Sequence, residues 1–157
     1  YAMTGGRPLL IDGDLRLLPL TRQLAAERSR GLFDQVIDGQ PIEAAILRDG
    51  LTDLHFLPAM GQAPPRKSIP ETLNSDAMAQ ALARLKSYFD TIIISAPPLL
   101  PVIDGRILAD YADQIVFVVA WQKTPKQIAK AALKMRNCIA CSNVIWININ
   151  GLFVKLE

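Results

Sequence analysis

The sequence contains few of the residues on which metal centres and redox sites depend. It has two cysteines and one histidine in 157 residues. Cys138 and Cys141 form a single Cys-x-x-Cys pair, which supplies only half of the ligands of a structural zinc site. We interpret both as small buried thiols between a helix and a strand, with a redox dithiol or half of a zinc site as the alternative. His55 lies in an apolar stretch and is expected to have a structural role.

The sequence also lacks a strong excess of charge and any long hydrophobic run. Seventeen basic and fifteen acidic residues leave a formal net charge of +2, which does not by itself demand a polyanionic partner. No apolar run reaches the roughly 18 residues that a membrane-spanning helix requires, and the N-terminal residues do not have the pattern of a signal peptide. Hydrophobic residues make up 50% of the chain, which is sufficient for the core of one domain of this length.

The clearest pattern is an apolar run that ends at two carboxylates. Residues 9–11 are Leu-Leu-Ile, and Asp12, Gly13 and Asp14 follow them. Such a run is typical of a strand buried on both faces, and residues two apart in an extended chain point the same way. Asp12 and Asp14 are therefore candidates for binding a hydrated magnesium ion or for accepting a proton from a hydroxyl. The alternative is that they only end the strand and cap the next helix.

Two later runs have the same strand-like character, and the three together resemble a known family. Residues 91–95 precede Pro97-Pro98, and residues 114–120 follow further along the chain. The order resembles the cytoplasmic domain of the bacterial tyrosine autokinases (BY-kinases) of capsule and exopolysaccharide assembly. The second Walker motif of that family, three apolar residues followed by Asp-x-Asp-x-Arg, is matched by residues 9–16. Its Walker B motif, Ile-Ile-Ile-Asp-Ser-Pro-Pro, is matched by residues 92–98 except that Ser95 replaces the acid.

The alternation of strands with helices and this resemblance predict an α/β fold. We expect a parallel sheet with helices on both faces, of the P-loop NTPase-like, Rossmann-like three-layer kind. In the family, a strand and a Gly-x-x-x-x-Gly-Lys-Ser/Thr phosphate loop come before the second Walker motif, and the sequence contains no such loop. We therefore expect residues 1–157 to form a single partial domain, truncated at its N-terminus. Expected helices cover residues 19–26, 31–39, 41–47, 76–88, 104–111 and 124–136, and further strands cover residues 54–58 and 144–150.

The resemblance implies roles for individual residues and implies ATP and Mg²⁺ as the cofactors. Asp12 would approach the magnesium ion through its water shell, and Asp14 would orient or deprotonate a tyrosine hydroxyl. Arg16 would anchor the loop. Ser95 would stand at the position of the Walker B acid, and Asn148 would lie near the nucleotide base.

The resemblance also implies a fragment of a tyrosine autokinase that regulates the polymerisation and export of capsule or exopolysaccharide. Its implied partners are a transmembrane co-polymerase or activator segment and further copies of the chain, at the cytoplasmic face of the bacterial inner membrane, and nucleic acid is not expected. Because Ser95 is neutral and the phosphate loop is absent, we expect no ATP turnover by this chain alone. Tyr1, Tyr88 and Tyr111 are scattered, and the latter two are expected in core-facing helices.

Two alternatives stay open. The first is a ParA- or MinD-like ATPase, in which Lys126, Lys130 and Lys134, one helical turn apart, contact DNA or a membrane. An ordinary solvated helix face explains this basic stripe as well. The second alternative is a non-catalytic interaction module of a polysaccharide assembly system.

Overall fold

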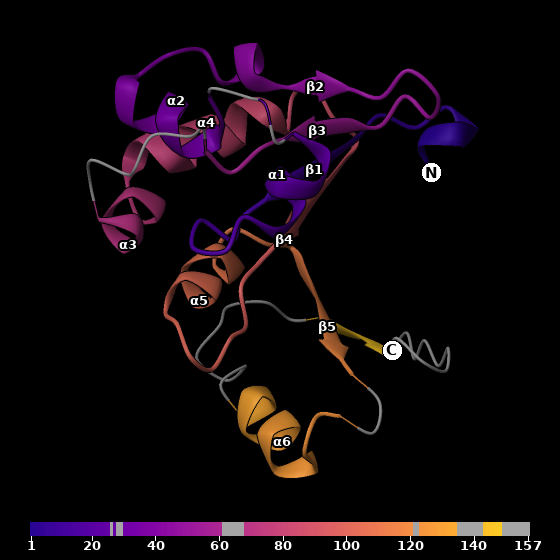
Figure 1. Ribbon diagram of the computed structural model, residues 1–157, viewed down its shortest axis with the longest axis vertical. Coiled ribbons are helices and arrows are strands. Elements are labelled where there is room, and N and C mark those ends of the chain that lie inside the picture. The colour runs from indigo at the N-terminus through magenta and orange to yellow at the C-terminus, as the bar shows by residue number, and fades with distance from the viewer. Residues whose placement is uncertain (26, 28–29, 61–67, 121–122, 135–142, 149–157) are drawn as a thin grey trace. The chain divides into compact units, whose positions relative to one another are not determined.

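The computed structural model describes residues 1–25, 27, 30–60, 68–120, 123–134 and 143–148. The chain forms two units, Tyr1–Pro97 and Pro98–Glu157 (Figure 1). The loop expected over residues 61–67 and the pair Cys138 and Cys141 lie outside the described residues. Among the residues that are described, no helix is long and apolar enough to cross a membrane.

The first unit is built on a four-stranded sheet with β1 (Pro8–Asp12) between two parallel neighbours. β3 (His55–Leu57) pairs with one edge of β1, and β4 (Thr91–Ser95) pairs with the other. Leu9 and Ile11 are fully buried, as expected for the aliphatic run of a central parallel strand. The parallel α/β arrangement predicted for these three strands is therefore confirmed.

The fourth strand of this sheet, β2 (Leu47–Arg48), was not predicted. It runs antiparallel to β3, so the sheet is mixed and has the order β2-β3-β1-β4. The helix expected over residues 41–47 is wrong beyond its first turn, because a short 3-10 helix, η2 (Ile42–Ala45), ends before β2 begins. A two-residue strand is held by its partner alone and has no periodicity of its own from which it could be predicted.

The remaining helices of the first unit follow the sequence signals closely. A 3-10 turn, η1 (Ala2–Thr4), precedes β1 and ends at Gly5 in the left-handed conformation. Proline lies at the start of α1 (Pro19–Leu24), and glycine follows the end of α2 (Leu32–Asp38), as the sequence predicts. α3 (Ile69–Leu73) was not predicted as a helix, although Pro70 in its first turn is compatible with one.

α4 (Asp76–Leu85) shows both an accurate prediction and a wrong one. The helix begins at residue 76 as predicted, and the hydroxyl of Ser75 caps it by accepting a hydrogen bond from the Met78 amide at 3.2 Å. Met78, Leu82 and Leu85 are buried, as their helical spacing indicates. The helix then ends at Leu85 rather than at Tyr88, so the 3.6-residue period stops and Tyr88 is 50% exposed instead of facing the core.

The second unit contains a parallel pair of strands connected through a helix. β5 (Gln114–Val119) and β6 (Asn143–Asn148) pair in parallel, with α6 (Lys126–Lys134) between them in the sequence. Such a connection is what parallel strands require. α5 (Asp104–Ala109) precedes β5 and ends before Tyr111, which lies in a turn and is only partly buried. The expectation that Tyr111 is in a core-facing helix is therefore wrong.

Candidate functional site

The Asp12 side chain lies at the end of β1 and is completely buried. Its Oδ2 accepts two hydrogen bonds from Thr21, one from the amide at 2.7 Å and one from the hydroxyl at 2.8 Å. Its Oδ1 accepts one longer bond, 3.3 Å, from the Asp14 amide. A buried carboxylate requires such donors, because it has lost its water. Oδ2 is therefore fully engaged by the protein, and Oδ1 keeps capacity for another partner.

Thr21 connects this carboxylate to a third segment of the chain. Its hydroxyl oxygen accepts a hydrogen bond from the Ala59 amide at 2.8 Å, just beyond β3. A threonine hydroxyl has one proton, so Thr21 donates this proton to Asp12 and accepts the hydrogen bond from Ala59 with a lone pair of the oxygen. Sequence reasoning missed Thr21, since a threonine in the first turn of a predicted helix has no pattern that distinguishes it. The end of β1, the start of α1 and the segment after β3 are thus held together by one side chain.

Asp14 stabilises the turn between β1 and α1. Its Oδ1 accepts hydrogen bonds from the amides of Arg16 at 3.1 Å and Leu17 at 2.9 Å, and its carbonyl accepts one from the Leu18 amide at 2.9 Å. Aspartate commonly stabilises turns in this way. Leu18 has a left-handed backbone (φ 53°), a conformation that costs energy in a residue with a side chain. These contacts agree with the alternative in which Asp14 ends the strand and caps the segment that follows. The catalytic role of Asp14 stays a prediction.

Ser95 lies beside Asp12 because the two residues are partners in the register of β1 and β4. The Gly13 amide donates a hydrogen bond to the Ser95 carbonyl at 2.8 Å, which extends the contact one residue beyond the strands. Asn148, the other predicted nucleotide contact, is the last residue of β6 in the second unit and pairs with Val119. The structure therefore brings together Asp12, Asp14 and Ser95, and the role of Asn148 stays a prediction.

The donor set at the end of β1 was compared with what a magnesium ion requires. Among the described residues, no group of three or more His, Cys, Asp or Glu side chains could hold a metal ion. Mg²⁺ usually keeps several waters and is bound through one or two carboxylates together with phosphate oxygens. Asp12 and Asp14, with the Ser95 hydroxyl at the neighbouring strand end, fit such a hydrated ion by ligand type. Because Asp12 is fully buried, an ion would reach its Oδ1 only after a local rearrangement.

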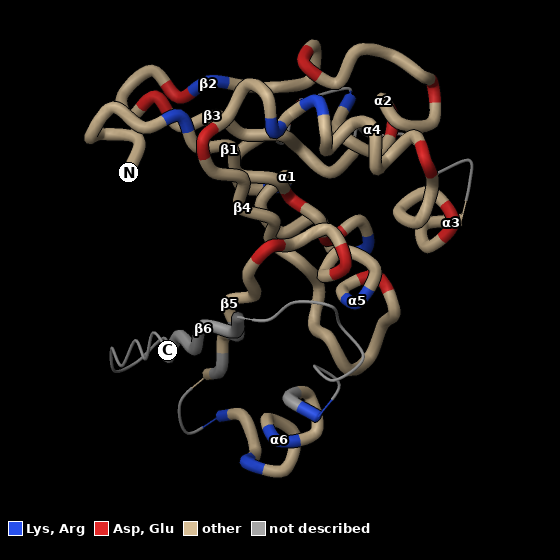
Figure 2. Tube along the Cα trace, turned by 180° about the vertical axis from the view of Figure 1, so that it is seen from behind, with Lys and Arg blue, Asp and Glu red and all other residues tan. Residues whose placement is uncertain are grey.

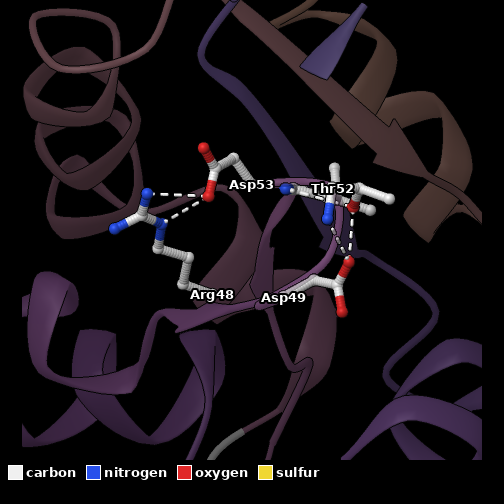
Figure 3. Close-up of polar contacts among 5 residues, drawn as sticks. Arg48, Asp49, Thr52 and Asp53 are labelled. Carbon is white, nitrogen blue, oxygen red and sulfur yellow. Dashed lines mark hydrogen bonds and ion pairs between the residues drawn. The ribbon is translucent and has the colours of Figure 1, made fainter. Parts of the chain in front are cut away.

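A second cluster of polar residues lies in the connection between β2 and β3 (Figure 3). The Arg48 guanidinium donates to Asp53 Oδ1 from Nε at 3.0 Å and from a terminal nitrogen at 2.7 Å. Asp49 Oδ2 accepts hydrogen bonds from the hydroxyl and the amide of Thr52. The Thr52 hydroxyl, and then its amide, hold the pKa of the Asp49 carboxyl below its usual value. These local bonds close the turn, and we assign them a structural role.

The lowered pKa of Asp49 predicts a specific dependence of stability on pH. Since the folded-state pKa is lower than the unfolded one, Asp49 stabilises the fold above its unfolded pKa and loses this contribution as the pH falls through the folded pKa. Chemical denaturation at neutral and at acidic pH should show a larger acid-induced loss for the wild type than for Asp49→Asn. Equal losses in the two proteins would contradict the assignment.

The fold of the chain is shared with solved structures of other proteins. The kinase domain of the Escherichia coli tyrosine kinase ETK superimposes with a TM-score of 0.83 at 18% identity, covering 99% of this chain and 62% of that domain. MinD in the MinC:MinD cell division protein complex of Aquifex aeolicus gives a TM-score of 0.72 at 20% identity, covering 94% of this chain and 57% of that one. The chain therefore has the P-loop NTPase-like fold that tyrosine kinase domains share with MinD.

Sequence comparison gives the particular relationship within this class. The chain is 34% identical to the succinoglycan biosynthesis transport protein ExoP of Rhizobium meliloti over 149 residues, which cover 95% of this chain and 19% of ExoP. It is 32% identical to the tyrosine-protein kinase YwqD of Bacillus subtilis over 139 residues, which cover 88% of this chain and 57% of YwqD. No family model matches the chain. The homologues of the chain thus include a bacterial tyrosine-protein kinase and a succinoglycan biosynthesis transport protein, which confirms the predicted relationship. The chain spans less than two thirds of the length of each of these two relatives.

Proposed function

We propose that the chain is part of the ATP- and magnesium-binding domain of a bacterial tyrosine kinase that regulates the synthesis and export of a capsular or extracellular polysaccharide. The observation that carries the proposal is the arrangement at the end of β1. Asp12 and Asp14 follow a central parallel strand, and Ser95 is the partner of Asp12 on the next strand. In parallel α/β sheets, ligands bind outside the carboxyl ends of the strands.

The roles within this site follow from the contacts. Thr21 holds Oδ2 of Asp12, so Oδ1 is the atom that would accept a hydrogen bond from a water bound to the magnesium ion. When bound, the ion neutralises charge on the phosphates. Asp14, at the start of the next turn, would orient a tyrosine hydroxyl or accept its proton. We propose that this chain shows no measurable autophosphorylation when it is incubated with labelled ATP, because its sequence contains no Gly-x-x-x-x-Gly-Lys-Ser/Thr loop and Ser95 is neutral.

The partners and the location are part of the same proposal. We expect the domain to act with a transmembrane activator segment of a polysaccharide co-polymerase, and with further copies of itself, at the inner face of the bacterial plasma membrane. The name of ExoP, a biosynthesis transport protein, supports an association with polysaccharide export. The names of other relatives, among them YwqD, support a tyrosine kinase.

The test of the nucleotide site is to restore the missing carboxylate. Ser95→Asp places a second negative charge beside Asp12. Without magnesium the two carboxylates repel each other, and with magnesium both attract the ion. Calorimetry should therefore show magnesium-dependent ATP binding about tenfold tighter in Ser95→Asp than in the wild type, a change of about 1.4 kcal/mol.

Ser87→Asp is the matched control, because Ser87 is exposed beyond α4, away from the end of β1. It should bind ATP as the wild type does. Equal ATP affinities in the Ser95→Asp and Ser87→Asp variants, with magnesium present, would overturn the placement of Ser95 in the nucleotide site.

A further inference from the structure

Charge is unevenly distributed along the chain. Between Asp113 and Glu157 the sequence contains no acidic residue, although it contains five lysines and one arginine. The formal charge of the whole chain is only +2, so the remainder of the sequence is net acidic. Figure 2 shows basic residues without Asp or Glu on α6, whereas basic and acidic residues are mixed in the first unit.

The lysines of α6 form an exposed basic face. Lys126, Lys130 and Lys134 are all exposed and follow one another at intervals of four residues, which is about 6 Å along a helix. Lys123, just before the helix, is exposed as well. Within the described part of the chain, none of these four ammonium groups forms an ion pair with a carboxylate. We refer to these four residues as the lysine face.

The lysine face does not stabilise its own helix. Like charges four residues apart on a helix repel each other, whereas a solvated face normally alternates acidic and basic residues. Lys126 also lies in the first turn, where the helix dipole disfavours a positive charge and where α6 has no acidic residue. The repulsion is therefore unfavourable for the isolated helix, although Lys134 in the last turn is favoured by the dipole, and an anionic partner on this face would relieve it.

From this charge distribution we infer that the lysine face docks on the anionic lipid headgroups of a bilayer. A flat, diffuse negative surface matches a row of flexible point charges, each of which contributes about a fivefold increase in binding. α6 has no arginine and no aromatic residue with which to contact or stack on bases, so a nucleic acid is the less suitable partner. The choice of a membrane rests on the proposed function, which places the domain beside a bilayer. Docking would orient α6 along the membrane surface.

Flotation of the chain with lipid vesicles tests this inference directly and needs no nucleotide. The chain should bind vesicles made of equal parts phosphatidylcholine and phosphatidylglycerol, but not vesicles of phosphatidylcholine alone, and added salt should weaken binding. Replacing Lys126, Lys130 and Lys134 together by glutamine should reduce binding roughly 100-fold. Replacing the same three residues by arginine should preserve it, because the charge is kept.

A control variant separates the lysine face from net charge. Arg22, Arg30 and Lys86 are exposed in the first unit, and replacing all three by glutamine changes the net charge as much as the α6 variant does. This control should bind vesicles within about twofold of the wild type, because its three residues lie outside the lysine face. Each lysine removed from the lysine face, in contrast, should weaken binding about fivefold. Equal losses in the two triple variants, absence of binding to anionic vesicles, or tighter binding to duplex DNA than to vesicles would each overturn the inference. Magnesium-dependent ATP binding, measured on the same preparations, reports separately on the proposed function.

Discussion

Replacing Asp12 by alanine is expected to lower the free energy of unfolding of the first unit by about 4 kcal/mol. The substitution removes the acceptor of three hydrogen bonds in a site without solvent exposure. Two donors of Thr21 and the amide of Asp14 would then be buried without partners. Because the chain has two units, the loss is best measured by hydrogen exchange at the amides of β1 rather than by one global signal.

Two variants show whether this cost comes from the lost hydrogen bonds. Asp12→Asn keeps one acceptor oxygen and should cost about half as much as Asp12→Ala. Thr21→Val keeps the shape of the side chain and removes only the hydroxyl, which Asp12 and Ala59 share. Because these residues contact each other, the double variant Asp12→Ala with Thr21→Val should cost less than the two single losses together. If the loss in the free energy of unfolding of the double variant equalled the sum of the two single losses, Asp12 and Thr21 would not be coupled.

Replacing Gly31 by alanine is expected to cost about 3 kcal/mol, at the upper end for overpacking. A Cβ atom at this position would lie 2.5 Å from the Pro58 carbonyl oxygen, 2.6 Å from the Met60 nitrogen and 2.8 Å from the Ala59 carbonyl carbon. These are backbone atoms, so no side-chain rotation relieves the contacts. The same segment accepts hydrogen bonds at 2.8 Å from the amides of residues 32 and 33 at the start of α2, and moving it would weaken them.

Gly50→Ala is the matched control for this second prediction. No atom lies within 4 Å of a Cβ built at Gly50, and its backbone is not in the left-handed region. The substitution should be neutral, or stabilise by up to about 1 kcal/mol, since alanine restricts the unfolded chain. Thermal unfolding monitored by circular dichroism gives the comparison. If Gly31→Ala and Gly50→Ala melted at the same temperature, the close approach of α2 to the segment after β3 would be wrong.

The elements that could be predicted from the sequence are those with a strong local signal. The aliphatic runs of β1 and β4 predict strands, of which β1 is buried and β4 is partly exposed, and the spacing of Met78, Leu82 and Leu85 predicts an amphipathic helix. β2 and α3 were not predicted because each is short and is stabilised mainly by its neighbours. Tyr88 was assigned to the core because a period continued past a helix end that the sequence does not mark.

The candidate site likewise contains contacts that the sequence indicated and contacts that it did not. The adjacency of Asp12 and Ser95 agrees with the family resemblance, which assigned Ser95 to the position of the Walker B acid, although the strand order itself was not predicted. The hydrogen bonds of Thr21 could not be predicted, because they join residues 9 and 38 positions apart in the chain. Such contacts depend on how α1 and the segment after β3 pack on β1. Local sequence patterns contain no information on that packing.

The single hydroxyl proton of Thr21 has a consequence for how this domain could transmit a signal. The hydrogen bond from the Ala59 amide to the Thr21 oxygen favours the orientation in which the hydroxyl donates its proton to Asp12. A displacement of the segment that follows β3 would release this constraint, and the hydroxyl could then rotate away from the carboxylate. The hydroxyl bond to Asp12 is in this way coupled to the segment after β3, while the Thr21 amide continues to hold the carboxylate, so a shift of that segment would weaken one of the three hydrogen bonds of Asp12.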